Sequence, residues 1–346
     1  MARKKQDIAP EPETHGPRNT FSLIGHRAAL ATAARAIRAG RPPQGWLISG
    51  PPGVGKATFA FRIARYLLAY GATDRGPEDL SVPENDATAM QITAGGHPGL
   101  LVLQRGINPN TGKPMTVLGV DEVRKLHGFF GMTSGAGGWR VAIVDTADDM
   151  NDAAANALLK ALEEPPPRAM LMLLSNAPGQ LLPTIRSRCQ RLDLRPLSGA
   201  ELSAELERQL PDLSAAQRAA LVRISGGSIG AALTLAEDDG LALAQEAERV
   251  IDRASSPDVS ATLALADKLS RINDGTDRFG GFLVEALTDC IRERAMAGGA
   301  GLDRWTDVLE KLRRSFTRTA ALHLDPRQTI LSADKAIADT ARRRAL

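Results

Sequence analysis

Residues 50 to 58 read Gly-Pro-Pro-Gly-Val-Gly-Lys-Ala-Thr, a set of residue types whose spacing is typical of a loop that binds nucleotide phosphates. Gly50, Gly53 and Gly55 would let backbone N–H groups approach phosphate oxygens, and Lys56 supplies a positive charge where a helix is expected to begin. The alternative interpretation is an ordinary glycine-rich turn between a strand and a helix. We expect the phosphates of ATP or ADP to bind here.

The residue after the lysine departs from the motif. Ala57 stands where working ATPases of this type carry a Ser or Thr whose hydroxyl holds Mg²⁺ against the β and γ phosphates. Thr58 is a poor substitute, because one step along a helix turns a side chain by about 100°. The sequence therefore predicts a cofactor site for ATP or ADP that binds nucleotide without hydrolysing it.

A second candidate for the same site is Asp145, which ends the apolar run 141–145. P-loop ATPases place a magnesium-binding Asp at the end of such a strand and often follow it with a Glu, whereas the next residue here is Thr146. A plain helix-capping loop is the alternative for Asp145. Asp121-Glu122 resembles the complete pair, but the amphipathic run after it favours Asp121 as a helix N-cap.

Two further polar sites follow the strand expected at residues 170–175. Asn176 could hydrogen-bond a phosphate or water, or it could cap a turn. Arg186 and Arg188 follow in the segment 183–189. A guanidinium donates two parallel hydrogen bonds and keeps its charge, which suits a phosphate, although an ordinary surface salt bridge is the alternative for a lone arginine pair.

The elements needed to position these residues alternate between helix and strand, which predicts an α/β fold with a doubly wound parallel sheet. The expected elements are a helix at 27–39, a strand at 46–49, a helix at 56–70, a strand at 100–103, a helix at 121–130, a strand at 140–145, a helix at 151–163 and a strand at 170–175.

The chain beyond this part is expected to be helical. Short helices separated by Pro211 and Gly226-Gly227 are followed by longer ones, with breaks near Gly299 and Pro326. The predicted domains are a disordered tail at 1–18, an α/β P-loop domain at 19–196, a small helical lid domain at 197–239 and an all-α collar domain at 240–346. The stretch 71–97, rich in Gly, Pro and acidic residues, is expected to be a surface excursion.

Composition excludes several classes. The net charge of +3 includes two short basic runs at residues 3–5 and 342–344, so it does not by itself establish nucleic-acid binding. Two cysteines are too few for a Cys₄ zinc site or a disulfide framework, which favours a reduced cytoplasmic protein without a metal. No run approaches the roughly 18 apolar residues of a membrane helix. A DNA-binding regulator is a weak alternative, because no helix-turn-helix pattern or aromatic platform accompanies the basic runs.

Four blocks of sequence together carry a family resemblance. These are GPPGVGK, VAIVDTADDMNDAAANALLKALEEPPP, LLSNAPGQLLPTIRSRC and GGSIGAAL. They resemble the bacterial clamp-loader branch of the AAA+ proteins, and within it the delta-prime subunits of DNA polymerase III. The resemblance covers about residues 20 to 235 and fades in the last third.

The resemblance implies a role for Arg188. In this family the matching arginine reaches across a subunit boundary to the γ-phosphate held by a neighbouring motor subunit, so Arg188 would be an arginine finger acting in trans. Motor subunits carry Thr, Glu and Arg where this chain has Ala57, Thr146 and Gly230. A subunit that has lost its own site but completes another's is expected to show this pattern. The zinc module of many relatives should also be missing.

The function implied is that of a non-catalytic subunit of a hetero-oligomeric clamp loader. Its partners would be gamma/tau-type motor subunits and a delta-type subunit, with the sliding clamp and primed DNA reached through the complex. It would have no ATPase or polymerase activity of its own while forming part of a DNA-directed DNA polymerase, a nucleotidyltransferase. The alternative is an active AAA+ ATPase motor in which Thr58 and Asp148 replace the missing groups.

Overall fold

The computed structural model describes residues 16–107, 115–131, 138–272, 274–298, 301–322 and 324–342. These residues form two compact units. The first runs to Arg208 and includes Gly227–Gly230, and the second contains Gln209–Gly226 and the chain from Ala231 onward. Most of the expected tail at 1–18, the basic run at 3–5, the expected break at Gly299 and the end of the run at 342–344 lie outside the described residues.

The first unit is built on a five-stranded parallel sheet of order β2-β3-β4-β1-β5. In chain order its elements are α1 (Arg27–Arg38), β1 (Gly45–Ser49), α2 (Lys56–Tyr70), α3 (Ala87–Thr93), β2 (Leu100–Leu103), α4 (Val120–Gly131), β3 (Arg140–Val144), α5 (Asp152–Glu163), β4 (Ala169–Ser175), α6 (Pro183–Arg186), β5 (Gln190–Asp193) and α7 (Gly199–Gln209), with 3₁₀ turns η1 (Ala147–Asp149) and η2 (Pro178–Gln180).

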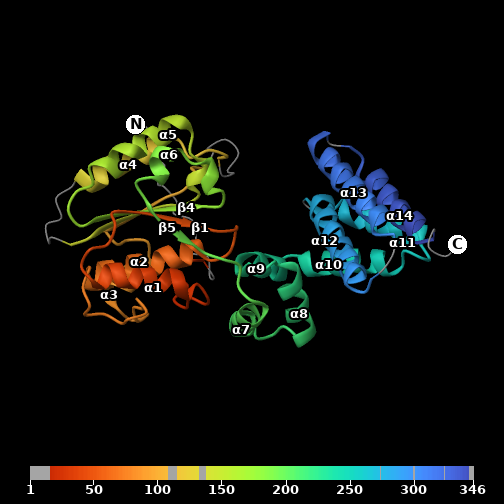
Figure 1. Ribbon diagram of the computed structural model, residues 1–346, viewed down its shortest axis with the longest axis horizontal. Helices are drawn as coiled ribbons and strands as arrows, with labels where there is room; N and C mark the ends of the chain where they lie inside the picture. Colours follow the sequence, from red (N-terminus) through yellow and green to blue (C-terminus); the bar gives the residue numbers. More distant parts are fainter. Residues whose placement is uncertain are drawn as a thin grey trace, which may run out of the picture. The chain divides into compact units, whose positions relative to one another are not determined.

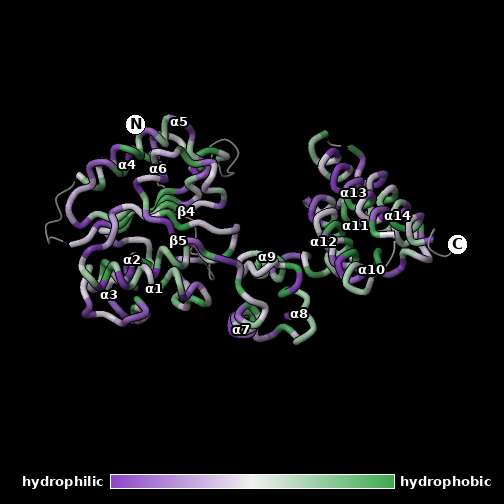
Figure 2. The backbone as a smooth tube through the Cα atoms, in the orientation of Figure 1, coloured by the Kyte–Doolittle hydropathy of each residue, from purple (hydrophilic) through white to green (hydrophobic). Residues whose placement is uncertain are grey.

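Helices cover both faces of this sheet, with α1, α2 and α3 on one side and α4, α5 and α6 on the other (Figure 1). Strand side chains alternate between the two apolar cores. In β4, Met170 and Met172 join the core beneath α2, while Leu171 and Leu173 join the core beneath α5. The strands are therefore apolar on both faces, and the tube of β4 is hydrophobic along its length (Figure 2).

The expected helices and strands of this unit are confirmed to within two residues. The helix over 56–70 and the strand over 100–103 have the predicted bounds. Asn151 caps α5 by accepting a 2.9 Å hydrogen bond from the backbone N–H of Ala154. The fold class is also confirmed: a P-loop α/β unit of the AAA+ type with a parallel sheet, followed by helices.

Two local predictions are wrong. The stretch 71–97 is not simply a surface excursion, because Leu80 and Ile92 are fully buried and α3 packs against α2. Asp121 is not an N-cap, since α4 already begins at Val120 and the Asp121 carboxylate pairs with Arg124 at 3.1 Å in the first turn. In the stretch 71–97, tertiary packing buried side chains that local composition left exposed, whereas α4 differs from the prediction in beginning one residue earlier.

The second unit is helical over its described residues. It contains α8 (Ala215–Ile224), most of α9 (Ile229–Glu237), α10 (Gly240–Asp252), α11 (Val259–Leu269), α12 (Gly275–Met296), α13 (Leu302–Leu322) and α14 (Pro326–Arg342). Helices α10 to α14 share one apolar core around Leu243, Phe279, Leu312 and Ile337. The break at Pro326 is confirmed, because proline there begins α14.

The limits of the three domains expected from sequence stay a prediction. The chain divides into two units, and the first of them takes in all of α7 except its last residue, together with the short segment Gly227–Gly230. Within the described residues, no helix combines the length and apolar composition that crossing a bilayer requires.

Candidate functional site

The glycine-rich loop joins β1 to α2, as the motif predicts. Its backbone reaches positive φ at Gly53 (69°) and at Gly55 (104°), a region that residues with a side chain rarely adopt. Helix α2 begins at Lys56, so the positive end of its dipole faces the loop. This is the local geometry of a phosphate-binding turn.

Lys56 is held inside the loop. Its buried Nζ donates hydrogen bonds to the carbonyl oxygens of Gly50 (2.8 Å) and Pro51 (2.7 Å) and to Oδ1 of Asn176 (2.6 Å). Burial lowers the pKa of the ammonium from 10.5, and the nearby carboxylates of Asp148 and Asp145 oppose that shift. The structure thus brings Asn176, from the end of β4, to the lysine of the loop.

The next three loop carbonyls also have donors from distant parts of the chain. Ser228 Oγ donates to the Pro52 carbonyl (3.0 Å), and the backbone N–H of Gly230 donates to the Gly53 carbonyl (2.8 Å). His26 Nε2 lies 2.9 Å from the Val54 carbonyl, so this nitrogen carries the proton of the imidazole. Because these carbonyls are fixed by outside groups, the conformation of the loop is set before any ligand arrives.

Gly230 makes a second contact that bears on function. A Cβ built on it would lie 2.9 Å from the Gly53 Cα and 3.1 Å from the Gly53 carbonyl oxygen. Such distances leave no room for a side chain unless the loop moves. The position where the motor subunits are expected to carry arginine is therefore filled here by backbone-to-backbone packing.

Asp145 follows β3 beside the loop. Burial raises the pKa of its carboxyl above 3.8, against the hydrogen bond from Gln104 and the charge of Lys56, which lower it. Thr146, in the place of the missing Glu, has a left-handed backbone with φ of 56°, and its hydroxyl donates 2.7 Å to the carbonyl of Asp145. The Thr146 hydroxyl is therefore hydrogen-bonded to the backbone of the preceding residue.

Asp148 is a residue of this site that sequence reasoning treated only as a possible replacement catalytic group. One carboxylate oxygen accepts from Ser175 Oγ at 2.6 Å, and the other accepts from the backbone N–H groups of Asn176 (2.5 Å) and Ala177 (3.3 Å). It ties η1 to the end of β4 and so fixes Asn176. The only signal in the sequence was an acidic pair, Asp148-Asp149, in the turn that follows a buried strand.

Ala57 and Thr58 lie in the first turn of α2, and both are half-buried. Asp121 and Glu122 make exposed ion pairs with Arg124 (3.1 Å) and Lys125 (2.6 Å) within α4. The pair Asp121-Glu122 is thus accounted for by its own helix. In the described part of the chain, no group of three or more His, Cys, Asp or Glu side chains could hold a metal ion.

Arg188 lies between α6 and β5. Its Nη2 is 2.9 Å from Oε1 of Glu163, at the end of α5, and its Nη1 donates to the carbonyl of Thr184 at 3.1 Å. The side chain is 38% exposed and that of Glu163 is 48% exposed. The surface salt bridge that the sequence left open is therefore present, in a solvent-accessible position.

Arg188 is far from the loop of its own chain. Strands β1 and β5 are parallel, with Trp46 beside Gln190 and Ser49 beside Asp193. The loop follows the carboxyl end of β1, whereas Arg188 precedes the amino end of β5. At about 3.3 Å of rise per residue, the four steps from Gly45 to Ser49 separate the two ends by roughly 13 Å. The structure does not bring Arg188 together with Lys56, Asp145 and Asn176.

A parallel sheet of order β2-β3-β4-β1-β5 with a phosphate-binding loop after β1, followed by a helical part, is the architecture of the P-loop AAA+ class of proteins. Residues 25–198 match the family model described as "DNA polymerase III, delta subunit". A DNA polymerase III subunit delta' from Pseudomonas aeruginosa is 40% identical over 185 residues, which cover 53% of this chain and 52% of that protein. The subunit delta' from Escherichia coli is 36% identical over 204 residues, covering 59% and 58%. The chain therefore belongs to the family of DNA polymerase III delta-prime subunits.

A more distant relative covers more of the chain. The DNA polymerase III subunit tau from Salmonella typhimurium is 26% identical over 319 residues, which are 90% of this chain and 45% of that protein. The chain thus spans about half the length of the curated relatives it matches.

Proposed function

We propose that this protein is a non-catalytic subunit of the clamp loader, supplying Arg188 in trans to the nucleotide site of a neighbouring motor subunit. The observation that carries the proposal is the position of Arg188 at the amino end of β5, at the end of the sheet opposite to its own loop. A guanidinium there cannot serve the nucleotide site of its own chain. It is half-exposed, so another chain can reach it.

The site in cis lacks the groups that catalysis needs. Ala57 has no hydroxyl for magnesium, the Thr146 hydroxyl bonds to the preceding carbonyl, and Gly230 has no space for the arginine of the motor subunits. Asp148 is occupied by three donors, so it is not available as a replacement for the missing Glu. These observations support a site without turnover over the active-motor alternative.

The geometry of the glycine-rich loop supports the proposal that ATP or ADP binds here without being hydrolysed. Its glycines adopt the conformations that turn N–H groups toward a phosphate, and its outward carbonyls are already hydrogen-bonded. The proposed partners are gamma/tau-type motor subunits and a delta-type subunit, with the sliding clamp and primed DNA engaged through the assembled hetero-oligomer. A role in chromosome replication also implies a cytoplasmic protein.

Replacing Arg188 with Ala tests the proposal in a clamp loader reconstituted with the other subunits of the same organism. We expect this subunit to be incorporated while DNA-stimulated ATP hydrolysis falls, because an arginine finger contributes about 10³- to 10⁵-fold at the one site it enters. The complex loses only the share of its rate that comes from that site.

Arg186→Ala is the matched control. Arg186 is an exposed arginine two residues away, so its loss should leave the rate unchanged. Equal rates for Arg188→Ala and wild type would refute the finger. Magnesium-dependent hydrolysis by the isolated chain, lost on Lys56→Ala, would instead support the motor alternative.

A further inference from the structure

Both terminal nitrogens of Arg188 already have partners within this chain. Nη2 is paired with the Glu163 carboxylate at 2.9 Å, and Nη1 donates to the Thr184 carbonyl at 3.1 Å. A guanidinium binds a phosphate best through two parallel hydrogen bonds, and a carboxylate competes for the same fork. Arg188 must therefore give up Glu163 before it can bind an external phosphate in this way.

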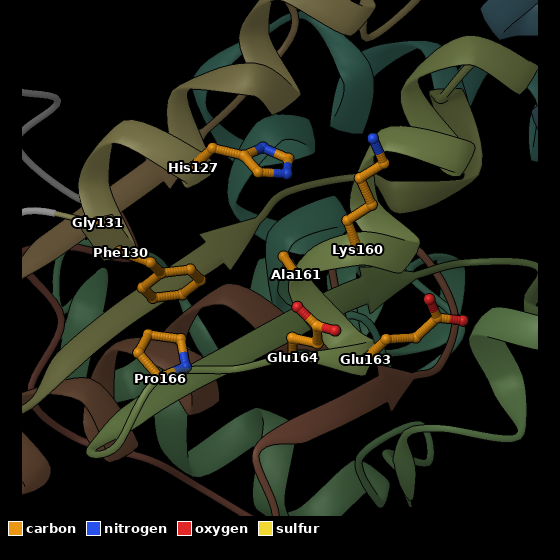
Figure 3. Close-up of a pocket in the computed structure, with 8 residues that line it drawn as sticks. All are labelled: His127, Phe130, Gly131, Lys160, Ala161, Glu163, Glu164 and Pro166. Atoms are coloured by element: carbon orange, nitrogen blue, oxygen red, sulfur yellow. The ribbon is translucent and has the colours of Figure 1, made fainter.

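Arg188 can readily exchange the Glu163 carboxylate for another partner. Both side chains are more than one third exposed, and exposed ion pairs are weak because water competes for both charges. Glu163 also lines a cavity of about 530 Å³ between α4 and α5, together with His127 and Lys160 (Figure 3). The carboxylate therefore has open space beside it into which it can turn.

Lys160 is a second cationic residue with which the Glu163 carboxylate can pair. It precedes Glu163 by three residues on α5, a spacing at which side chains of opposite charge meet. It lines the same cavity, and in the described residues no ion pair of Lys160 with a carboxylate is present. When Arg188 leaves, the Glu163 carboxylate can turn to Lys160 without losing a cationic partner.

We infer that Glu163 is a positioning residue that holds Arg188 in the free subunit and competes with the neighbour's γ-phosphate for it. This inference rests on the proposed function of Arg188. It makes the finger an exchangeable one: the neighbour's triphosphate captures Arg188 from Glu163, whereas a diphosphate, with one charged group fewer, leaves the internal pair in place. The contact would thus add to the discrimination between ATP-loaded and ADP-loaded neighbours.

The test measures the dissociation constant between the full chain and its motor subunit, loaded either with a non-hydrolysable ATP analogue or with ADP. Glu163→Gln keeps the shape of the side chain and removes the competing charge. We expect binding to the ATP-analogue form to tighten by about 1.5- to 5-fold, the range of exposed ion pairs, and binding to the ADP form to stay unchanged. Glu163→Asp, which keeps the charge, should restore wild-type behaviour.

Glu164→Gln is the matched control. The Glu164 carboxylate points in a different direction from that of Glu163 in Figure 3, and in the described part of the chain it has no ion pair with Arg188. We expect no change in either dissociation constant. A distortion of α5 would change the dissociation constants for the ATP-analogue form and the ADP form alike. An effect on the ATP-analogue form alone therefore separates competition from a structural role.

The Arg188→Ala background distinguishes the two ways of failing. If Arg188→Ala leaves binding to the ATP-analogue form unchanged, the finger itself is wrong and the inference falls with it. If Arg188→Ala weakens that binding but Glu163→Gln does not tighten it, the role of Arg188 as a finger is supported. The proposed competition between Glu163 and the γ-phosphate is then wrong. The competition is also overturned if Glu163→Gln still tightens binding when Arg188 is absent, because the two effects would then be independent.

Discussion

Two aspartates lie within four residues after β3, and their surroundings differ. Asp145 is half-buried beside Lys56, and burial raises the pKa of its carboxyl. Asp148 instead receives three hydrogen bonds from the end of β4. Buried carboxylates cost free energy unless donors replace the lost water, so the same residue type should have opposite effects on stability at these two positions.

We expect Asp145→Asn to raise the free energy of unfolding at pH 7. The pKa of Asp145 is higher in the folded than in the unfolded protein, so the folded state loses stability as pH rises from 3.8 through the folded pKa. The full penalty is present at pH 7 and absent below the unfolded pKa. The gain from Asp145→Asn should therefore shrink as pH falls toward 4, which urea unfolding at a series of pH values can measure.

Asp148→Ala is the comparison for this series. It leaves Ser175 Oγ and two backbone N–H groups without their acceptor, which should lower the free energy of unfolding by about 1 to 3 kcal/mol. A loss of stability at pH 7 in Asp145→Asn would contradict the assignment of a burial penalty to that carboxyl.

At the scale of elements, α2 organises the first unit. Its first turn begins at the loop lysine, and its apolar residues fill the core against the sheet. The stretch 71–97 packs on this helix through α3, with Ile92 fully buried. Arg65 of α2 is also buried, which lowers its pKa to about 10, and its guanidinium donates to the Thr20 carbonyl at 3.0 Å. The chain at Thr20 and α3 are thus both held against α2.

Truncating Ile92 tests whether α3 is part of this core. We expect Ile92→Ala to lower the free energy of unfolding by about 2 to 5 kcal/mol, because a fully buried isoleucine would leave a cavity. Met90, on the same helix but 59% exposed, is the control, and Met90→Ala should change stability little. Equal urea midpoints for the two variants would mean that α3 lies outside the cooperative core.

At the scale of the whole molecule, the segment Gly227–Gly230 belongs to the first unit although residues on both sides of it belong to the second. Gly227 accepts from the backbone N–H of Leu197 at 2.9 Å, and Ser228 and Gly230 donate to the loop carbonyls. The chain therefore returns to the phosphate-binding loop after α8. The two contacts with the loop link residues more than 170 positions apart, 176 in the case of Ser228 and Pro52.

Gly230→Ala tests this contact. A Cβ at 2.9 Å from the Gly53 Cα must push the loop away, so we expect a loss of about 1 to 3 kcal/mol. Gly281→Ala is the matched control, since Gly281 is also in a helix and a Cβ there meets nothing within 4 Å. That variant should be unchanged or more stable by up to about 1 kcal/mol. Similar urea midpoints for the two variants would refute the close approach of Gly230 to the loop.

Much of the first unit was predictable because its signals are local. The glycines at 50, 53 and 55 with Lys56 indicated a phosphate-binding loop between a strand and a helix, and the apolar runs that became β3 and β4 indicated strands. Asp121 shows where local reasoning failed: an acidic residue before an amphipathic run indicates a cap, yet the helix had already begun at Val120. The buried side of the stretch 71–97 was invisible for the same reason, because polar neighbours surround Leu80 and Ile92 in sequence.

By itself the sequence determined the loop, the alternation of elements and the absence of a hydroxyl at Ala57, since each depends on a few adjacent residues. Only the tertiary structure decided that Asp148 holds the end of β4, that Gly230 packs on the loop, and that Arg188 pairs with Glu163 at the far end of the sheet. Those contacts join residues far apart in the chain, and the packing of strands and helices selects them from many pairs that sequence alone leaves equally possible.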